Sequence, residues 1–181
     1  MSTGFKEWTL ICDALGRGEQ SIILRKGGIA EGRAGFRFQH DDFLLFPTLF
    51  HEQVRKLKLP TDTPLPALRE DGQIAVHLRV QVEWTRDVTD WATVQRLAPF
   101  HLWQEPEIEK RFRQDDTPAV SLAFIRASRL SQPFTFPDAP AYGGCRSWVK
   151  LPDLPAEITS LPAIDEAAHR DRERQLLAVL G

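Results

Sequence analysis

The chain has 181 residues, with 23 Lys and Arg against 25 Asp and Glu, and a formal net charge of −2 at pH 7. Apolar residues make up 42% of the chain and charged residues 27%, a balance that excludes a disordered protein. No apolar run reaches the ~18 residues of a transmembrane helix, and the first residues lack the basic-then-apolar order of a signal peptide. We therefore expect a soluble, cytoplasmic protein with a single domain over residues 1–181.

The cysteine count and the charge exclude two further classes of protein. Cys12 and Cys145 are too few for a disulfide framework or for a zinc site of their own. A protein that coats duplex nucleic acid through charge alone is strongly basic, which this chain is not. A nucleic-acid contact therefore requires a local basic patch. Four cations of the N-terminal third supply one within thirteen positions, namely Arg25, Lys26, Arg33 and Arg37.

The first quarter of the chain predicts one helix and then three strands. Residues 5–16 have the apolar spacing of an amphipathic helix, which Gly16 ends. Residues 20–25 form a short apolar run rich in β-branched side chains, which predicts a strand. Two further apolar segments, 36–39 and 43–46, predict strands as well.

The middle of the chain contains the strongest strand signal. Residues 50–57 predict a short helix with basic residues at its C-terminal end, and three prolines mark 58–73 as a loop. Residues 74–84 then alternate apolar and polar side chains over eleven positions, which is typical of a half-buried strand. After this strand, Thr89 or Asp90 is a candidate cap for a following helix.

The last part of the chain returns to strand and ends in a helix. We predict a helix at 106–113, a strand at 119–130, an extended segment at 132–140 and a final helix at about 162–180. The elements lack the regular βαβ alternation of a doubly wound parallel sheet. The prediction is an α+β fold: a compact, curved, mainly antiparallel β-sheet or small β-barrel with flanking helices.

Two cations and two glycines follow the strand predicted at 20–25. Arg25 and Lys26 carry the charge, while Gly27 and Gly28 leave backbone amides accessible. This combination suits an anionic group such as phosphate, so we predict that the four residues bind ligand. A glycine hairpin with solvated charges is the alternative. The spacing matches neither a P-loop nor a dinucleotide-binding fingerprint.

Residues 40–52 hold two histidines and three carboxylates in a short stretch. Their spacing matches no metal-ligand motif, and we expect neither a metal nor another cofactor. In an enzyme, His51 is the candidate general base and Glu52 or Asp42 would assist it. Thr48 lies where a strand gives way to a helix. It is a candidate to hydrogen-bond a ligand, or it simply caps the helix.

The third candidate segment runs from Tyr142 to Trp148. The two aromatic rings and the planar Arg146 guanidinium are suited to clamp an unstacked base, and the Ser147 hydroxyl to hydrogen-bond its edge. Cys145 as a nucleophile needs a nearby base, and no histidine lies close to it in sequence. A structural loop around a buried tryptophan is the alternative.

Three segments taken together resemble a known family. The segments are KEWTLICDAL with GEQSIILRKGGI (6–29), FLLFPTLFHEQ (43–53) and YGGCRSWVKL (142–151). In this order, and over nearly the whole chain, they resemble the bacterial and archaeal family catalogued as domain of unknown function 1802. The resemblance is specific to the family and implies no particular activity.

A fainter resemblance is to the ASCH domains, which are PUA-like barrels with a Gly-x-Lys-x-x-Glu-x-Arg signature. The same spacing here gives Gly18, Gln20, Ile23 and Arg25. Glycine and arginine are kept, whereas an amide and an aliphatic side chain replace the charged pair. The resemblance implies a PUA-like β-barrel with an arginine-lined cleft and argues against ASCH-type hydrolytic chemistry.

These observations favour a module that binds RNA or DNA, as a single strand or through a splayed or modified base, over an enzyme. In this interpretation the three candidate segments border one cleft. The alternatives are a hydrolytic enzyme that acts on a nucleotide or nucleic acid through a histidine–carboxylate pair, and a protein-interaction domain. No membrane partner is expected, and the sequence indicates no particular protein partner.

Overall fold

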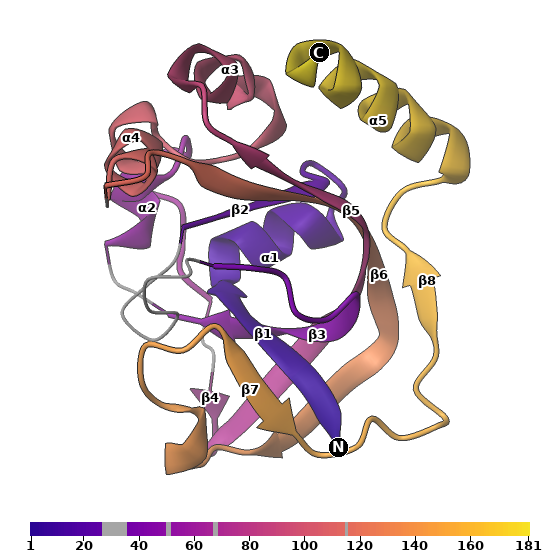
Figure 1. The fold of residues 1–181 in the computed structure, drawn as a ribbon. Helices are drawn as coiled ribbons and strands as arrows, with labels where there is room; N and C mark the ends of the chain where they lie inside the picture. Colours follow the sequence, from indigo (N-terminus) through magenta and orange to yellow (C-terminus); the bar gives the residue numbers. More distant parts are fainter. Residues whose placement is uncertain (27–35, 50–51, 67–68, 115) are drawn as a thin grey trace.

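A computed structural model describes residues 1–26, 36–49, 52–66, 69–114 and 116–181 (Figure 1). Its sheet has the strand order β2-β6-β5-β3-β1-β7, with β4 added beside β5 and β8 beside β6. The strands are β1 (Ser2–Trp8), β2 (Ile22–Arg25), β3 (Asp42–Thr48), β4 (Arg69–Glu70), β5 (Gln73–Val88), β6 (Val120–Pro137), β7 (Trp148–Leu151) and β8 (Ser160–Pro162). Strands β1 and β3 run parallel, and the other described pairs are antiparallel. This confirms the predicted α+β fold with a curved, mainly antiparallel sheet and flanking helices.

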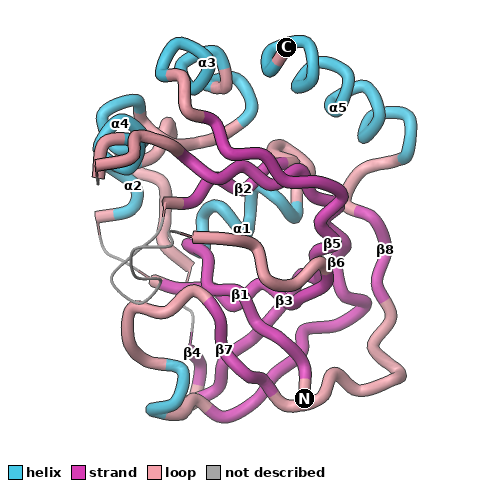
Figure 2. Tube along the Cα trace, in the orientation of Figure 1, coloured by secondary structure: helices cyan, strands magenta, loops and turns pink. Residues whose placement is uncertain are grey.

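One helix lies within the curve of the sheet and the others lie at its margins (Figures 1 and 2). The helices are α1 (Thr9–Gly16), α2 (Gln53–Lys56), α3 (Trp91–Arg96), α4 (Glu105–Phe112) and α5 (Glu166–Leu180), with short 3-10 turns at Ala98–Phe100 and Pro140–Tyr142. Six of the eight residues of α1 are buried, because strands β1, β3, β5 and β6 surround it. Within the described residues, no helix is long and apolar enough to cross a membrane.

The curvature comes from the two longest strands, β5 and β6. Their antiparallel pairing shifts register between Val76 and Leu78 and again between Val82 and Trp84. Such irregularities bend a sheet and increase its twist. Along β5 the predicted alternation holds, since Ile74 and the apolar residues at every second position up to Val80 are buried.

Strand β3 separates two hydrophobic cores. Phe43 and Leu45 face the larger core around α1, whereas Leu44 and Phe46 face a smaller core between β3, β5, β6 and β7. Successive side chains of a strand point to opposite faces, so a strand buried on both faces has an uninterrupted apolar run. This explains the continuous apolar sequence of residues 43–46.

A glycine ends α1 and fixes the direction of the chain into β2. Gly18 has a φ of +70°, and its N–H donates to the Leu15 carbonyl over 3.1 Å. The next N–H, of Glu19, donates to the Ala14 carbonyl over 2.9 Å. This pair of bonds is a Schellman motif, which glycine favours because a side chain is strained at positive φ.

Two of the predicted elements were placed wrongly. The helix predicted at 5–16 begins only at Thr9, because residues 2–8 pair with β3 and β7 as a strand. Residues 36–39, predicted as a strand, are irregular in structure. The segment predicted as extended at 132–140 is extended up to Pro137, as the last part of β6. In each case pairing between distant segments decides the outcome, and local pattern does not encode it.

Candidate functional site

Strand β1 brings two of the predicted ligand residues to Glu7. The Arg25 guanidinium donates to the carbonyl of Lys6 and lies 3.1 Å from the Glu7 carboxylate (Nη2 to Oε2). The Thr48 hydroxyl donates to the Glu7 carbonyl over 3.0 Å, because the parallel register places Thr48 opposite Trp8. The side chain of Glu7 is 1% exposed and that of Arg25 13%. Segments 25–26 and 46–48 therefore meet at Glu7.

The third predicted segment reaches the same strand through Trp148. The antiparallel pairing of β1 with β7 places Trp148 opposite Phe5, and their ring centroids lie 4.7 Å apart. The Trp148 ring also contacts Phe43 and His40, at 5.1 and 4.9 Å between centroids. The Arg25 guanidinium also contacts these aromatic rings, with its Cζ 4.7 Å from the Phe5 centroid. Trp148 is thus half-buried and largely enclosed by protein.

Helix α4 places a second guanidinium near Glu7 and Arg25, and no sequence pattern had predicted it. Arg111 lies over the Trp103 ring, 3.8 Å from its centroid, and 5.6 Å from that of Trp8. The pKa of Arg111 is lowered to about 10, mainly by burial and also by the nearby charge of Arg25, against the opposing effect of Glu7. A pKa of about 10 still leaves Arg111 protonated at pH 7.

The Arg111 guanidinium has no hydrogen-bond acceptor within the described ranges, although two indole rings lie against it. The neighbouring Glu107 is held by Lys56, at 3.1 Å. We call Glu7, Arg25 and Arg111 the Glu7 site. Two guanidinium groups against one carboxylate give this site a formal charge of +1, so it favours an anion.

The predicted basic turn is described only in part. Lys26 follows Arg25 and its Nζ donates to the Thr117 carbonyl over 2.6 Å. Gly27 and Gly28 lie outside the described residues. The ligand role predicted for these residues stays a prediction.

The candidate catalytic residues do not share a described cluster. His51 lies outside the described residues. Glu52 is exposed directly before α2. Asp42 is exposed on β3 and forms an ion pair with Arg79, with 2.8 Å between Oδ1 and Nε. Among the side chains that the structure describes, no group of three His, Cys, Asp or Glu is placed to hold a metal ion.

Residues of the loop before Trp148 lie on different sides of the sheet. Tyr142 packs in the smaller core, 5.5 Å from the Phe46 ring centroid. The Ser147 carbonyl accepts the N–H of Lys6 over 2.8 Å, and Arg146 is exposed. Burial lowers the pKa of the Lys6 ammonium, and the charge of Arg146 lowers it further. Ser147 and Trp148 therefore contact β1, whereas Tyr142 packs in the smaller core.

Glu7 and Arg111 were missed for a definable reason. Glu7 falls in a segment predicted as an amphipathic helix, in which a glutamate is expected on the solvent-exposed face. Arg111 lies in the correctly predicted helix α4, whose sequence carries Lys110 and Arg113 as equally plausible cations. The one available signal is that residues 4–8, taken as a strand, place Glu7 on the same face as the apolar Phe5.

Comparisons with known proteins place the chain in a family. A search of solved structures found a mutant of an ASCH protein from Zymomonas mobilis, with 11% identity over 96% of this chain and 94% of that chain and a TM-score of 0.47. It also found the ASCH protein from the same organism, with 13% identity, coverages of 98% and 94% and a TM-score of 0.44. No curated protein matches the chain. The model of the family described as "Domain of unknown function (DUF1802)" matches residues 4–175, and the chain belongs to this family.

Proposed function

We propose that the chain binds nucleic acid, RNA or DNA, as a single strand or through a splayed or modified base, and that the Glu7 site holds the bound phosphate. The observation that carries this proposal is Arg111: its donors have no acceptor within the described part of the chain, and its face lies on Trp103. A guanidinium held flat by an indole keeps its donor edge free for a phosphate oxygen.

The other residues of the site have complementary roles in this proposal. Arg25 and Lys26 add positive charge beside Arg111, and Glu7 forms an ion pair with Arg25 that offsets part of this charge. The half-buried Trp8 offers an aromatic surface to a base, as does Trp148 at the opposite end of the cluster. A net charge of −2 over the whole chain then restricts nucleic acid to this local patch.

The test is a salt-titrated binding assay with fluorescent single-stranded RNA, single-stranded DNA and duplex probes. We expect Arg111→Gln to weaken binding to every probe sequence and to reduce the slope of log K against log salt by about 0.7 for each lost single-strand phosphate contact. Arg113→Gln is the matched control, because Arg113 is an exposed cation of the same helix, paired with Glu109 at 2.9 Å.

Two results would overturn the proposal. One is the absence of binding by the unmodified protein to any of the probes at low salt. The other is equal affinity and equal salt slope for Arg111→Gln and the unmodified protein. Thermal unfolding of each variant ensures that only folded protein is compared.

A further inference from the structure

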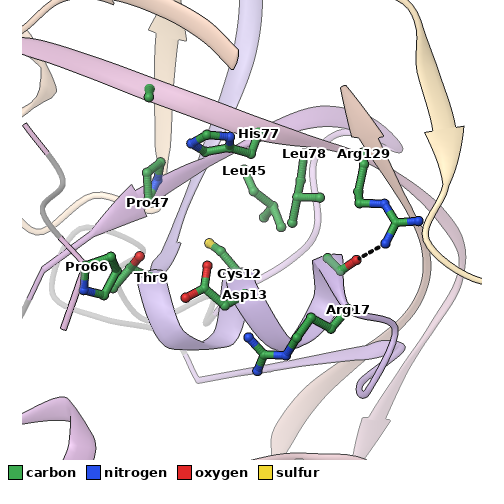
Figure 3. Close-up of a pocket in the computed structure, with 12 residues that line it drawn as sticks. Thr9, Cys12, Asp13, Arg17, Leu45, Pro47, Pro66, His77, Leu78 and Arg129 are labelled. Carbon is green, nitrogen blue, oxygen red and sulfur yellow. Dashed lines mark hydrogen bonds between the residues drawn. The ribbon is translucent and has the colours of Figure 1, made fainter. Parts of the chain in front are cut away.

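A cavity of about 320 Å³ lies between α1, β3 and β5, and none of the three residues of the Glu7 site lines it (Figure 3). Its walls are mainly aliphatic, with Leu45, Pro47 and Leu78 among the lining side chains. Ligand sites of this kind have volumes from roughly 300 Å³ upward and combine apolar walls with a few polar groups. The volume therefore suits a ligand of one or two fused rings.

Two polar side chains enter this cavity from opposite walls. Asp13 comes from α1 and His77 from β5, and Figure 3 shows both directed toward the space between them. Neither side chain has a hydrogen-bond partner within the described ranges. Burial raises the pKa of the Asp13 carboxyl, and the nearby Arg17 and His77 oppose this rise. The cavity thus presents a carboxylate acceptor and an imidazole that are not used by the fold.

The sheet irregularity explains why His77 lies there. Val76 pairs with Phe134 and Leu78 with Arg129, so His77 has no partner in the ladder between β5 and β6. An irregularity of this kind turns a side chain away from its regular direction and is frequent beside binding sites.

The two arginines at the rim are occupied by the protein. Arg17 forms a two-bond pair with Glu19, with 2.7 Å between Nε and Oε1. Arg129 donates to the Gly16 carbonyl over 3.1 Å, and in Figure 3 this bond directs its guanidinium away from Asp13. The centre of the cavity therefore suits a neutral ligand that donates to a carboxylate better than it suits an anion.

We propose that this cavity binds a neutral amino-substituted heteroaromatic ring with a ring nitrogen beside the amino group. Asp13 accepts a hydrogen bond from the amino group, and the His77 imidazole donates to the ring nitrogen. Adenine has this donor–acceptor pair at its N6 and N7 atoms. Pro47 and Leu78 cover the ring. This inference does not rest on the proposed function, because it uses different residues.

Calorimetric titration of the whole protein with adenosine and inosine tests the proposal. The two nucleosides have the same size, and inosine has an oxygen in place of the amino group. We expect adenosine to bind about tenfold more tightly than inosine, because the oxygen faces the Asp13 carboxylate with no proton to donate. In Asp13→Asn, whose amide also donates, this preference should disappear or reverse. Asp62→Asn is the control, an exposed aspartate that does not line the cavity.

A second variant tests the cavity itself. Ala75 lines the cavity and is half-buried, so Ala75→Leu fills part of the space and should abolish adenosine binding. Adenosine binding that survives Ala75→Leu, an unchanged preference in Asp13→Asn, or no heat of binding at millimolar adenosine would each overturn the proposal.

The source of the ring is decided by a competition experiment. A short oligoadenylate that displaces adenosine indicates a base within a strand, whereas displacement by free nucleosides alone indicates a metabolite. Arg111→Gln should leave adenosine affinity unchanged. Failure of the nucleic-acid proposal would therefore be visible separately from failure of this one.

Discussion

The carboxylate of Glu7 and the guanidinium of Arg25 lie 3.1 Å apart between β1 and β2, with side chains that are 1% and 13% exposed. The Glu7 carboxylate also accepts the backbone N–H of Trp8 over 2.7 Å. A buried ion pair of this kind contributes little compared with an apolar pair of the same shape, but the loss of one partner is costly because the other charge remains desolvated.

Glu7→Gln should therefore lower the free energy of unfolding by roughly 3–5 kcal/mol. The glutamine keeps the size of the side chain and an acceptor for Trp8, but it leaves the Arg25 charge unopposed. Chemical denaturation measures the loss. The control is Glu19→Gln in the exposed pair with Arg17, which should change stability by about 0–1 kcal/mol.

The same Glu7→Gln variant distinguishes a structural site from a binding site. If the Glu7 site binds phosphate, the removal of a negative charge should tighten oligonucleotide binding at temperatures where the variant is folded. Reduced affinity in a folded variant would contradict the phosphate role.

His101 should make stability depend on pH. Its Nδ1 accepts the N–H of Trp103 over 3.0 Å, and burial lowers its pKa to about 3, with the charge of Lys58 as a smaller cause. The folded state therefore holds neutral His101, while the unfolded state takes up a proton below about pH 6.5. This contribution is complete above pH 6.5 and is lost toward pH 3, at up to about 1.4 kcal/mol per pH unit.

The measurement compares the unmodified protein with His101→Asn by denaturation from pH 7 to pH 4. Asparagine has an acceptor close to the position of Nδ1 and no proton to gain, so the stability gap between the two proteins should shrink as the pH falls. A constant gap would show that the pKa of His101 is the same in the folded and unfolded states.

Two glycines allow backbone strain to be separated from steric overlap. Gly18 has a φ of +70°, and an added Cβ would lie 2.1 Å from Cγ2 of Ile164. Gly72 has a φ of +71° with open space around the Cβ position. Gly72→Ala should cost roughly 1–2 kcal/mol from the backbone alone. Gly18→Ala should cost roughly 1–3 kcal/mol more, because it also overpacks the contact with Ile164. Equal losses in thermal unfolding would contradict this geometry.

Trp148 should act mainly through packing. Its ring lies against Phe5 and Phe43, so Trp148→Ala should lower the free energy of unfolding by about 3 kcal/mol. Trp148→Phe retains most of the ring contact and should lose less. If Trp148 also stacks on a base, Trp148→Phe should weaken oligonucleotide binding with little change in salt slope, since stacking is mostly uncharged. Unchanged stability in Trp148→Ala would contradict the packing role.

Local signals were sufficient where one strand or helix carries its own pattern. The alternation of residues 74–84 predicted the central part of β5. Pro106 in the first turn predicted α4, and Asp90 caps α3 by accepting the Thr93 N–H over 2.8 Å. These signals lie within a few residues of the element they specify.

Structural features that depend on distant partners could not be predicted from the sequence. The segment from Phe5 to Trp8 has two aromatic residues at helical spacing, and only its pairing with β3 and β7 makes it a strand. The Asp71–Gly72 pair, with φ of +51° and +71°, forms the tight hairpin between β4 and β5 inside a region predicted as loop. The Glu7 site combines side chains from β1, β2 and α4, and no spacing in the sequence relates them.

The pairing of β1 with β7 also constrains when this edge of the sheet can form during synthesis. Ser2 lies opposite Leu151, although β1 leaves the ribosome before β7, which emerges nearly 150 residues later. At a synthesis rate of about 5–20 residues per second, that delay is roughly 7–30 s. During this time one edge of β1 has no partner, and the Phe5 ring lacks the indole that covers it in the finished protein. Closure of this edge must therefore wait until β7 has been made.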